Sequence, residues 1–210
     1  MMEELMASEW VIRQAYATKE WIETQPFKPH YVTEVADFEL DKLTQLHKAN
    51  LVIALVEKKQ IKGPIQLKGK MTLCLDGIQD PGNLGTIIRT ADWFGLNQIV
   101  VSADTASCYN PKVVQSTMGS ILRVDVIVAD LPEFIQSSKM PIYGAVLEGK
   151  YIQSTTLPKE GILVIGNESK GIRTPILSLI TDPITIPKYG NAESLNAAVA
   201  TGIILANWQH

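Results

Sequence analysis

The most constraining feature of the sequence is a regular alternation, between residues 71 and 208, of short apolar runs with segments of helical periodicity. Short apolar runs bounded by turn residues predict buried strands, and strands that alternate with helices are typical of a parallel sheet. The predicted strands are 71–75, 98–102, 124–128, 142–147, 161–165 and 184–187, and the predicted helices are 83–94, 111–120, 131–137, 174–179 and 194–208. The sequence therefore predicts an α/β fold, a parallel sheet with helices on both faces.

A different pattern precedes this region, and the turn residues Gly63, Pro64 and Gly69 separate the two. Because such residues mark a linker, we expect a small domain over residues 1–62, a linker over 63–70 and a larger domain over 71–210. The small domain is predicted to contain strands 11–16, 31–35 and 51–56 and helices 1–7, 19–23 and 38–47, with Asp37 as the N-cap of the last. Since it starts in the middle of an element, we expect a truncated α/β unit.

Composition excludes several classes of protein. Hydrophobic residues make up 46% of the chain and charged residues 20%, which is typical of a globular protein rather than of a disordered chain or a coiled coil. Two cysteines are too few for a disulfide framework and have no partners at metal-ligand spacing, so Cys74, in an apolar run, is expected to be a buried thiol. No apolar stretch predicts a membrane span, and the acidic residues 3 and 4 are unlike a signal peptide. We therefore expect a cytoplasmic enzyme or binding protein.

The charge balance gives no sign of nucleic-acid binding. The net charge is −3, and residues 1–70 carry ten basic and ten acidic side chains, whereas nucleic-acid-binding domains are usually basic. The one local excess of positive charge consists of Lys58, Lys59, Lys62, Lys68 and Lys70. These lysines form either a solvated linker or a strip that contacts phosphates beside a substrate groove.

The first segment that suggests chemistry is residues 76–94, in which a buried strand is followed by a turn-rich loop and a helix. We expect Asn83 to cap this helix, where free backbone N–H groups favour anions. Helical side chains lean toward the N-terminus, so Arg89 is predicted to point back toward the loop, with Gly85 leaving room for it. The alternative is a surface arginine near Asp92. The glycines do not have the G-x-G-x-x-G spacing of a dinucleotide site.

The second segment lies between Gly166 and Gly171, which bracket a polar loop after an apolar strand. Glycine loops at strand ends are where α/β proteins place ligands. Gly166 would allow a ligand to approach the backbone closely, and Glu168 is the one ionisable group that could act there. The alternative is an ordinary turn that leads into a helix beginning at Thr174.

The third segment begins at Ile184 and contains a helix predicted to start at Ser194. No residue between Ser194 and Gln209 carries a charge, and a helix that is apolar nearly all round is buried on most sides. This pattern favours a subunit interface over the alternative, the core helix of a monomer. Ser194 and Asn196 are polar at the start of this apolar helix, which makes them candidate ligand contacts.

Together and in this order, the three segments resemble the three motifs of the SpoU (TrmH-like) branch of the SPOUT RNA methyltransferases, over roughly residues 71–208. The first motif pairs Asn83 with Arg89, and the second is the G-N-E-x-x-G loop. The third motif is matched by Ile186, Pro187, Glu193, Ser194, Leu195 and Asn196. The front unit resembles a shortened ribosomal-protein-like RNA-binding domain.

The resemblance implies a C-terminal deep trefoil knot, S-adenosylmethionine as cofactor, a homodimer formed through the C-terminal helix, and no metal or membrane. The residues that it implies as catalytic are Asn83, Arg89, Glu168, Ser194 and Asn196. Those that it implies as cofactor contacts are Leu147, Gly166, Asn167, Gly171, Ile186 and Leu195.

The reaction implied is transfer of a methyl group from S-adenosylmethionine to a ribose 2′-hydroxyl of RNA, with ribosomal RNA favoured over transfer RNA. Arginine is a poor base, because its pKa is above about 12, so a bidentate phosphate clamp is the physically easier role for Arg89. The alternatives are a tRNA 2′-O-methyltransferase and a non-catalytic RNA-binding homodimer. The missing glycine fingerprint disfavours a nucleotide-dependent dehydrogenase.

Overall fold

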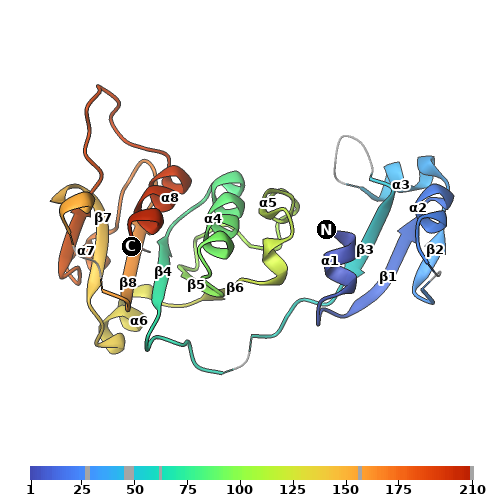
Figure 1. Cartoon of the computed structure of the whole chain (residues 1–210), viewed down its shortest axis with the longest axis horizontal. Helices are drawn as coiled ribbons and strands as arrows, with labels where there is room; N and C mark the ends of the chain where they lie inside the picture. The colour runs from blue at the N-terminus through green and yellow to red at the C-terminus, as the bar shows by residue number, and fades with distance from the viewer. Residues whose placement is uncertain (27–28, 45–49, 62, 156–157, 209–210) are drawn as a thin grey trace. The chain divides into compact units, whose positions relative to one another are not determined.

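The structure, a computed structural model of the chain, describes residues 1–26, 29–44, 50–61, 63–155 and 158–208. It divides into two compact units, Met1–Gln60 and Ile61–His210 (Figure 1). The predicted helix end at residue 47 and Lys62 lie outside the described residues.

The first unit is a three-stranded sheet in the order β2-β1-β3, in which β2 pairs with β1 in parallel and β3 pairs with it antiparallel. Its elements are α1 (Met2–Met6), β1 (Ile12–Ala17), α2 (Lys19–Glu23), β2 (Val32–Glu34), α3 (Asp37–Leu43) and β3 (Val52–Val56). Its small core is formed around Ala15, Ala17, Trp21 and Val32. The N-cap of α3 is Ala36, whose backbone N–H donates to the Glu39 side chain at 2.8 Å. The prediction of Asp37 as N-cap was therefore wrong by one residue.

The second unit is a six-stranded sheet in the order β6-β5-β4-β8-β7-β9, and every pair of neighbouring strands is parallel. The strands are β4 (Met71–Asp76), β5 (Gln98–Val101), β6 (Asp125–Val128), β7 (Ile142–Tyr151), β8 (Gly161–Gly166) and β9 (Asp182–Thr185). The helices are α4 (Pro81–Trp93), α5 (Pro111–Thr117), α6 (Leu131–Ser138), α7 (Thr174–Leu177) and α8 (Ala197–Trp208), with 3-10 turns at Ser120–Leu122 and Ile152–Ser154. The predicted parallel α/β sheet is confirmed.

Side chains that alternate along the central strands build a separate core on each face of the sheet. On one face, Leu73 and Leu163 pack with buried residues of α4, α5 and α8, and on the other Cys74 and Val164 pack with residues of α6 and α7. Figure 1 shows α4 and α8 side by side over the sheet, and the two helices are in contact. Cys74 is fully buried, as expected, and burial raises the pKa of its thiol.

Two helices begin at positions other than those predicted. Asp80 caps α4, because its side chain accepts from the Asn83 N–H at 2.8 Å and Pro81 takes the first helical position. Asn83 is therefore inside the first turn and is not the cap. Likewise, α8 begins at Ala197 rather than Ser194, and the Asn196 side chain accepts from the N–H groups of the first turn.

Gly85 lies where α4 approaches α5 most closely. A Cβ at this position would stand 2.4 Å from the Ser116 Cβ and 2.7 Å from the Val113 carbonyl oxygen. The absent side chain therefore makes room for α5, and not for Arg89 as the sequence suggested. The last strand also differs from the prediction, because β9 begins at Asp182 and includes Pro183, which an edge strand tolerates.

Candidate active site

The candidate site lies at the carboxyl ends of the two central strands. β4 and β8 are neighbours, and their last residues, Asp76 and Gly166, are directly paired. The chain order reverses between these strands, since β5 and β6 follow on one side and β7 and β9 on the other. In open α/β sheets this is the point at which ligands bind.

Three of the predicted site residues form one hydrogen-bond network. The Asn83 side chain of α4 donates its amide N–H to the carboxylate of Glu168, which follows β8. The Asn83 carbonyl oxygen accepts from the Asn196 amide, just before α8, at 2.8 Å. Asn83 can serve both partners because Asp80 has taken over the capping of α4. One residue from each of the three sequence segments therefore meets in a continuous network.

The loop after β8 is closed on itself. Asn167 and Gly171 exchange backbone hydrogen bonds of 3.1 and 2.8 Å, and Gly171 has φ +67°, which glycine adopts without strain. The Asn167 side chain accepts from the N–H groups of Ser169 and Lys170 and donates to the Gly77 carbonyl at 2.8 Å. A Cβ on Gly166 would lie 2.3 Å from the Gly171 backbone. Because Gly166 has no side chain, the backbone of Gly171 can pack directly against it.

Arg89 and Ser194 are not part of this network. The Arg89 side chain is exposed on α4 and forms no hydrogen bond or ion pair with any residue that the structure describes. Asp92, its suggested neighbour, instead pairs with Arg123, whose Nε lies 2.9 Å from the carboxylate. Ser194 is exposed and likewise has no polar partner within the described ranges. Both side chains are free to contact a substrate.

The predicted cofactor contacts surround the same edge but differ in exposure. Leu147 on β7 is 75% exposed and Leu195 46% exposed, whereas Ile186 is half-buried against the core. The Leu147 carbonyl accepts from the Thr185 hydroxyl at 3.1 Å, which joins β7 to the end of β9. Residues 188–195 are all exposed, and none of their backbone groups forms a hydrogen bond with another described residue.

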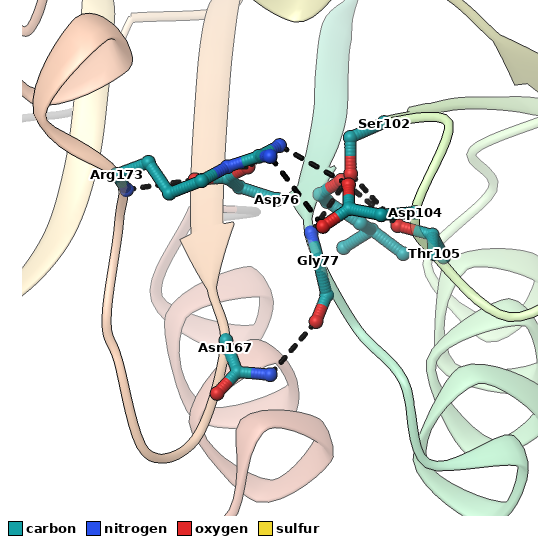
Figure 2. Close-up of polar contacts among 8 residues, drawn as sticks. Asp76, Gly77, Ser102, Asp104, Thr105, Asn167 and Arg173 are labelled. Carbon is teal, nitrogen blue, oxygen red and sulfur yellow. Dashed lines mark hydrogen bonds and ion pairs between the residues drawn. The ribbon is translucent and has the colours of Figure 1, made fainter.

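An ion-pair cluster at this edge was not predicted from the sequence. Asp76 is completely buried and accepts from Arg173, at 2.8 Å from the backbone N–H and 2.7 Å from Nε. Figure 2 shows the Arg173 guanidinium between Asp76 and Asp104, whose carboxylate lies 3.2 Å from Nη2. The hydrogen bond to Asp76 raises the pKa of Arg173. A carboxylate that ends an apolar strand needs a partner when buried, and this was the available signal.

Hydrogen bonds in the same cluster tie β5 to β4. The Ser102 hydroxyl accepts from the Gly77 N–H at 2.9 Å and lies 3.1 Å from the Thr105 hydroxyl. The hydrogen bond from Ser102 lowers the pKa of Asp104, partial burial opposes this, and the charge of Arg173 adds to the lowering. The ends of β4, β5 and β8 are therefore held to one another by polar side chains (Figure 2).

Within the residues that the structure describes, no group of three or more His, Cys, Asp or Glu side chains is arranged to hold a metal ion. None of the helices in that part of the chain has the length and apolar composition that crossing a bilayer requires.

Proteins of known sequence resemble about two thirds of the chain. The chain is 37% identical over 140 residues to the 23S rRNA (guanosine(2553)-2′-O)-methyltransferase RlmP of Bacillus subtilis, a match that covers 65% of this chain and 56% of that protein. It is 38% identical over 140 residues to the 23S rRNA (guanosine-2′-O-)-methyltransferase RlmB of Blochmanniella floridana, with 64% and 55% covered. The chain thus spans about half the length of the curated relatives that it matches.

Solved structures resemble the chain over nearly its full length. A TrmH-family protein from Porphyromonas gingivalis is 33% identical, with a TM-score of 0.84 over 95% of this chain and 83% of the other. An rRNA methyltransferase from Sinorhizobium meliloti, crystallised with AdoMet bound, is 25% identical, with a TM-score of 0.84 over 99% and 83%. The profile of the SpoU rRNA Methylase family matches residues 70–206. With that match, and with its three motif segments joined at one edge of the sheet, the chain belongs to the SpoU rRNA methylase family.

Proposed function

We propose that this protein is an RNA 2′-O-ribose methyltransferase that uses S-adenosylmethionine and acts on ribosomal RNA. The observation that carries the proposal is the hydrogen-bond network of Asn83, Glu168 and Asn196, which joins three segments far apart in the sequence. The curated relatives named above are 23S rRNA 2′-O-methyltransferases, which supports ribosomal RNA as the substrate.

The chemistry of the residues at this edge fits S-adenosylmethionine. Exposed leucines at positions 147 and 195 would supply apolar surface for the adenine and the methionine chain, and Gly166, Asn167, Gly171 and Ile186 would border the bound cofactor. The backbone groups of residues 188–195, which have no partner in the described ranges, would donate to and accept from the polar atoms of the cofactor. When bound, S-adenosylmethionine supplies an electrophilic methyl group on a sulfonium.

The chain's own residues would bind and orient the RNA nucleotide. The guanidinium of Arg89, which has no partner among the described residues, would hold a phosphate through two parallel hydrogen bonds. It would also stabilise the negative charge that develops on the 2′-oxygen as the hydroxyl proton passes to solvent water and the oxygen accepts the methyl group. Asn83, Glu168 and Asn196 would form the fixed wall of the nucleotide site, and Ser194 would donate to the nucleotide. Holding the hydroxyl in line with the methyl carbon supplies a large part of the rate.

The C-terminal segment is consistent with the trefoil knot of the resembled family. β9 pairs at the outer side of β7, whereas the helix that follows it packs on α4 and on β8. The connection 186–196 therefore returns from the edge of the sheet to its centre. We infer that this segment is threaded through a loop as a knot.

Several further properties belong to the same proposal. The first unit would be an RNA-binding domain, with the lysines of the linker contacting phosphates. The protein would form a homodimer through α8, would act in the cytoplasm and would need neither metal nor membrane.

The proposal is tested by transfer of tritiated methyl groups from S-adenosylmethionine to total bacterial RNA. A methyl group on the 2′-oxygen prevents alkaline cleavage of the adjacent phosphodiester, so the label is expected in alkali-resistant dinucleotides of ribosomal RNA. Arg89→Ala is expected to remove the activity. Label in transfer RNA would instead favour a tRNA 2′-O-methyltransferase, and RNA binding without transfer would favour a non-catalytic homodimer.

A further inference from the structure

The buried carboxylate of Asp76 and its partner Arg173 belong to none of the three motif pairings described above. Asp76 is the last residue of β4 and is completely buried. Arg173 satisfies it with a backbone N–H, with Nε and with Nη2, which together form a fork that a lysine cannot reproduce. The pair links residues that lie 97 positions apart in the chain.

Arg173 is poorly suited to bind a substrate anion. Its guanidinium lies between two carboxylates, Asp76 and Asp104, with Nη1 3.4 Å and Nη2 3.2 Å from the latter. The cluster therefore carries a net negative charge and occupies the donors of the arginine. Arg89, on α4, has no such partner among the described residues. Arg173 therefore binds carboxylates of its own chain, whereas Arg89 has its guanidinium exposed.

The Asp76–Arg173 pair fixes one end of the loop that carries Glu168. Arg173 follows Gly171, which closes this loop with Asn167, and at the other end the Asn167 side chain donates to the Gly77 carbonyl. Asp76 and Gly77 are consecutive, so both ends of the loop are held by the same short piece of chain at the end of β4 (Figure 2). Glu168 lies between the two attachments and accepts the Asn83 amide.

We propose that Asp76 and Arg173 are positioning residues for methyl transfer, which act by holding the 167–171 loop so that Glu168 binds Asn83. This inference rests on the proposed function. Removing the fork leaves only the backbone N–H of residue 173 on Asp76, so the loop gains freedom and Glu168 spends less time on Asn83. Because neither residue contacts the RNA in this account, the loss falls on kcat rather than on KM for RNA.

The test compares Arg173→Lys with Arg123→Lys. The second variant is a matched control, since Arg123 pairs with Asp92 near the opposite end of α4. Arg173→Lys is expected to lower kcat on ribosomal RNA by about 10- to 100-fold, the range that a small misplacement of a reacting group produces. KM for RNA and all parameters of Arg123→Lys are expected to stay within about twofold of the wild type.

A double-mutant cycle separates positioning from general loss of structure. If Arg173 acts through Glu168, then in a Glu168→Ala background, which has no acceptor for the Asn83 amide, Arg173→Lys changes kcat by less than about twofold. A merely structural role would lower kcat by the same factor in both backgrounds, and that result would overturn the inference. Asp76→Asn, which keeps an acceptor for the Arg173 backbone N–H, repeats the cycle if Arg173→Lys does not fold.

Hydrogen exchange gives a readout that does not need activity. The amides of residues 167–171 are expected to exchange at least about threefold faster in Arg173→Lys than in the wild type or Arg123→Lys, with α5 unchanged. If the wild type transfers no methyl group, the proposed function fails and exchange alone decides whether the pair positions the loop. Unchanged exchange, or faster exchange with an unchanged kcat in an active enzyme, would overturn the inference.

Discussion

Asn83 takes part in two side-chain hydrogen bonds that connect the N-terminus of α4 to the segments after β8 and before α8. It donates to Glu168 and accepts from Asn196, so the side chain at this position must both donate and accept. Replacing Asn83 by aspartate keeps the acceptor but places a carboxylate against that of Glu168. We therefore expect Asn83→Asp to lower the free energy of unfolding by about 1–2 kcal/mol, measured by urea unfolding at neutral pH.

A second substitution tests whether like-charge repulsion is the cause of that loss. Glu168→Gln provides an amide that donates to the new carboxylate, so the double variant Asn83→Asp with Glu168→Gln is expected to regain most of the lost stability. If the double variant instead loses the sum of what Asn83→Asp and Glu168→Gln lose singly, the contact between these side chains is absent in solution.

Asp104 makes part of the stability dependent on pH. The hydrogen bond from Ser102 and the charge of Arg173 lower its pKa in the folded protein, whereas the unfolded chain has a pKa of about 3.9. Ionised Asp104 therefore contributes stability above about pH 4, and the contribution is lost as the pH falls through the lower, folded pKa. Asp104→Asn is expected to be less stable than the wild type at neutral pH and to lose less stability between about pH 5 and about pH 3. Thermal midpoints across this range check the expectation, which parallel curves for the two proteins would refute.

At the scale of elements, the contact between α4 and α5 depends on Gly85. A Cβ there would lie 2.4 Å from the Cβ of Ser116 and 2.7 Å from a backbone oxygen, and that backbone cannot move without shifting α5. Gly85→Ala is expected to lower the free energy of unfolding by about 1–3 kcal/mol, although alanine is the better helix former. The neighbouring Thr86 is exposed, so Thr86→Ala serves as the control and should change stability by less than about 0.5 kcal/mol. Equal values for the two variants in chemical unfolding would rule out the close approach.

Sequence periodicity predicted where most elements lie but not where two functional helices begin. The apolar runs marked the strands because a parallel strand is buried on both faces. Asp80 and Asn83 are both good caps, and only the Pro81 between them favours the earlier start. At α8, Ser194 and Asn196 compete in the same way, and the choice of Asn196 depends on contacts with α4 that are distant in sequence.

The candidate site was predicted unevenly for a similar reason. Asn83, Glu168 and Asn196 lie in recognisable local patterns, so they could be singled out and the structure brings them together. Asp76 and Arg173 have no such local pattern. Their pairing follows from β4 lying next to β8, and strand order in a parallel sheet is not encoded in periodicity.

At the scale of the whole molecule, one side of α8 presents apolar surface that is not covered within one copy of the chain. The helix carries no charge, and its buried side consists of Ala197, Ala198, Thr201, Ile204, Leu205 and Trp208. On its other side Val199 is 50% exposed, and Ile203 and Ala206 are partly exposed. Closed symmetric dimers bury a surface of this kind against its own copy, which supports the proposed homodimer through α8.

A charge on the exposed side of α8 should therefore separate the proposed dimer. Val199→Glu would bury a carboxylate in an apolar interface, which is costly without a partner. Light scattering after size-exclusion chromatography is therefore expected to give the mass of two chains for the wild type and of one chain for the variant. Val128→Glu is the matched control, because Val128 is 66% exposed at the end of β6 and lies outside α8. Its mass is expected to equal that of the wild type. A single-chain mass for the wild type, or equal masses for the wild type and Val199→Glu, would exclude a dimer that depends on this face of α8.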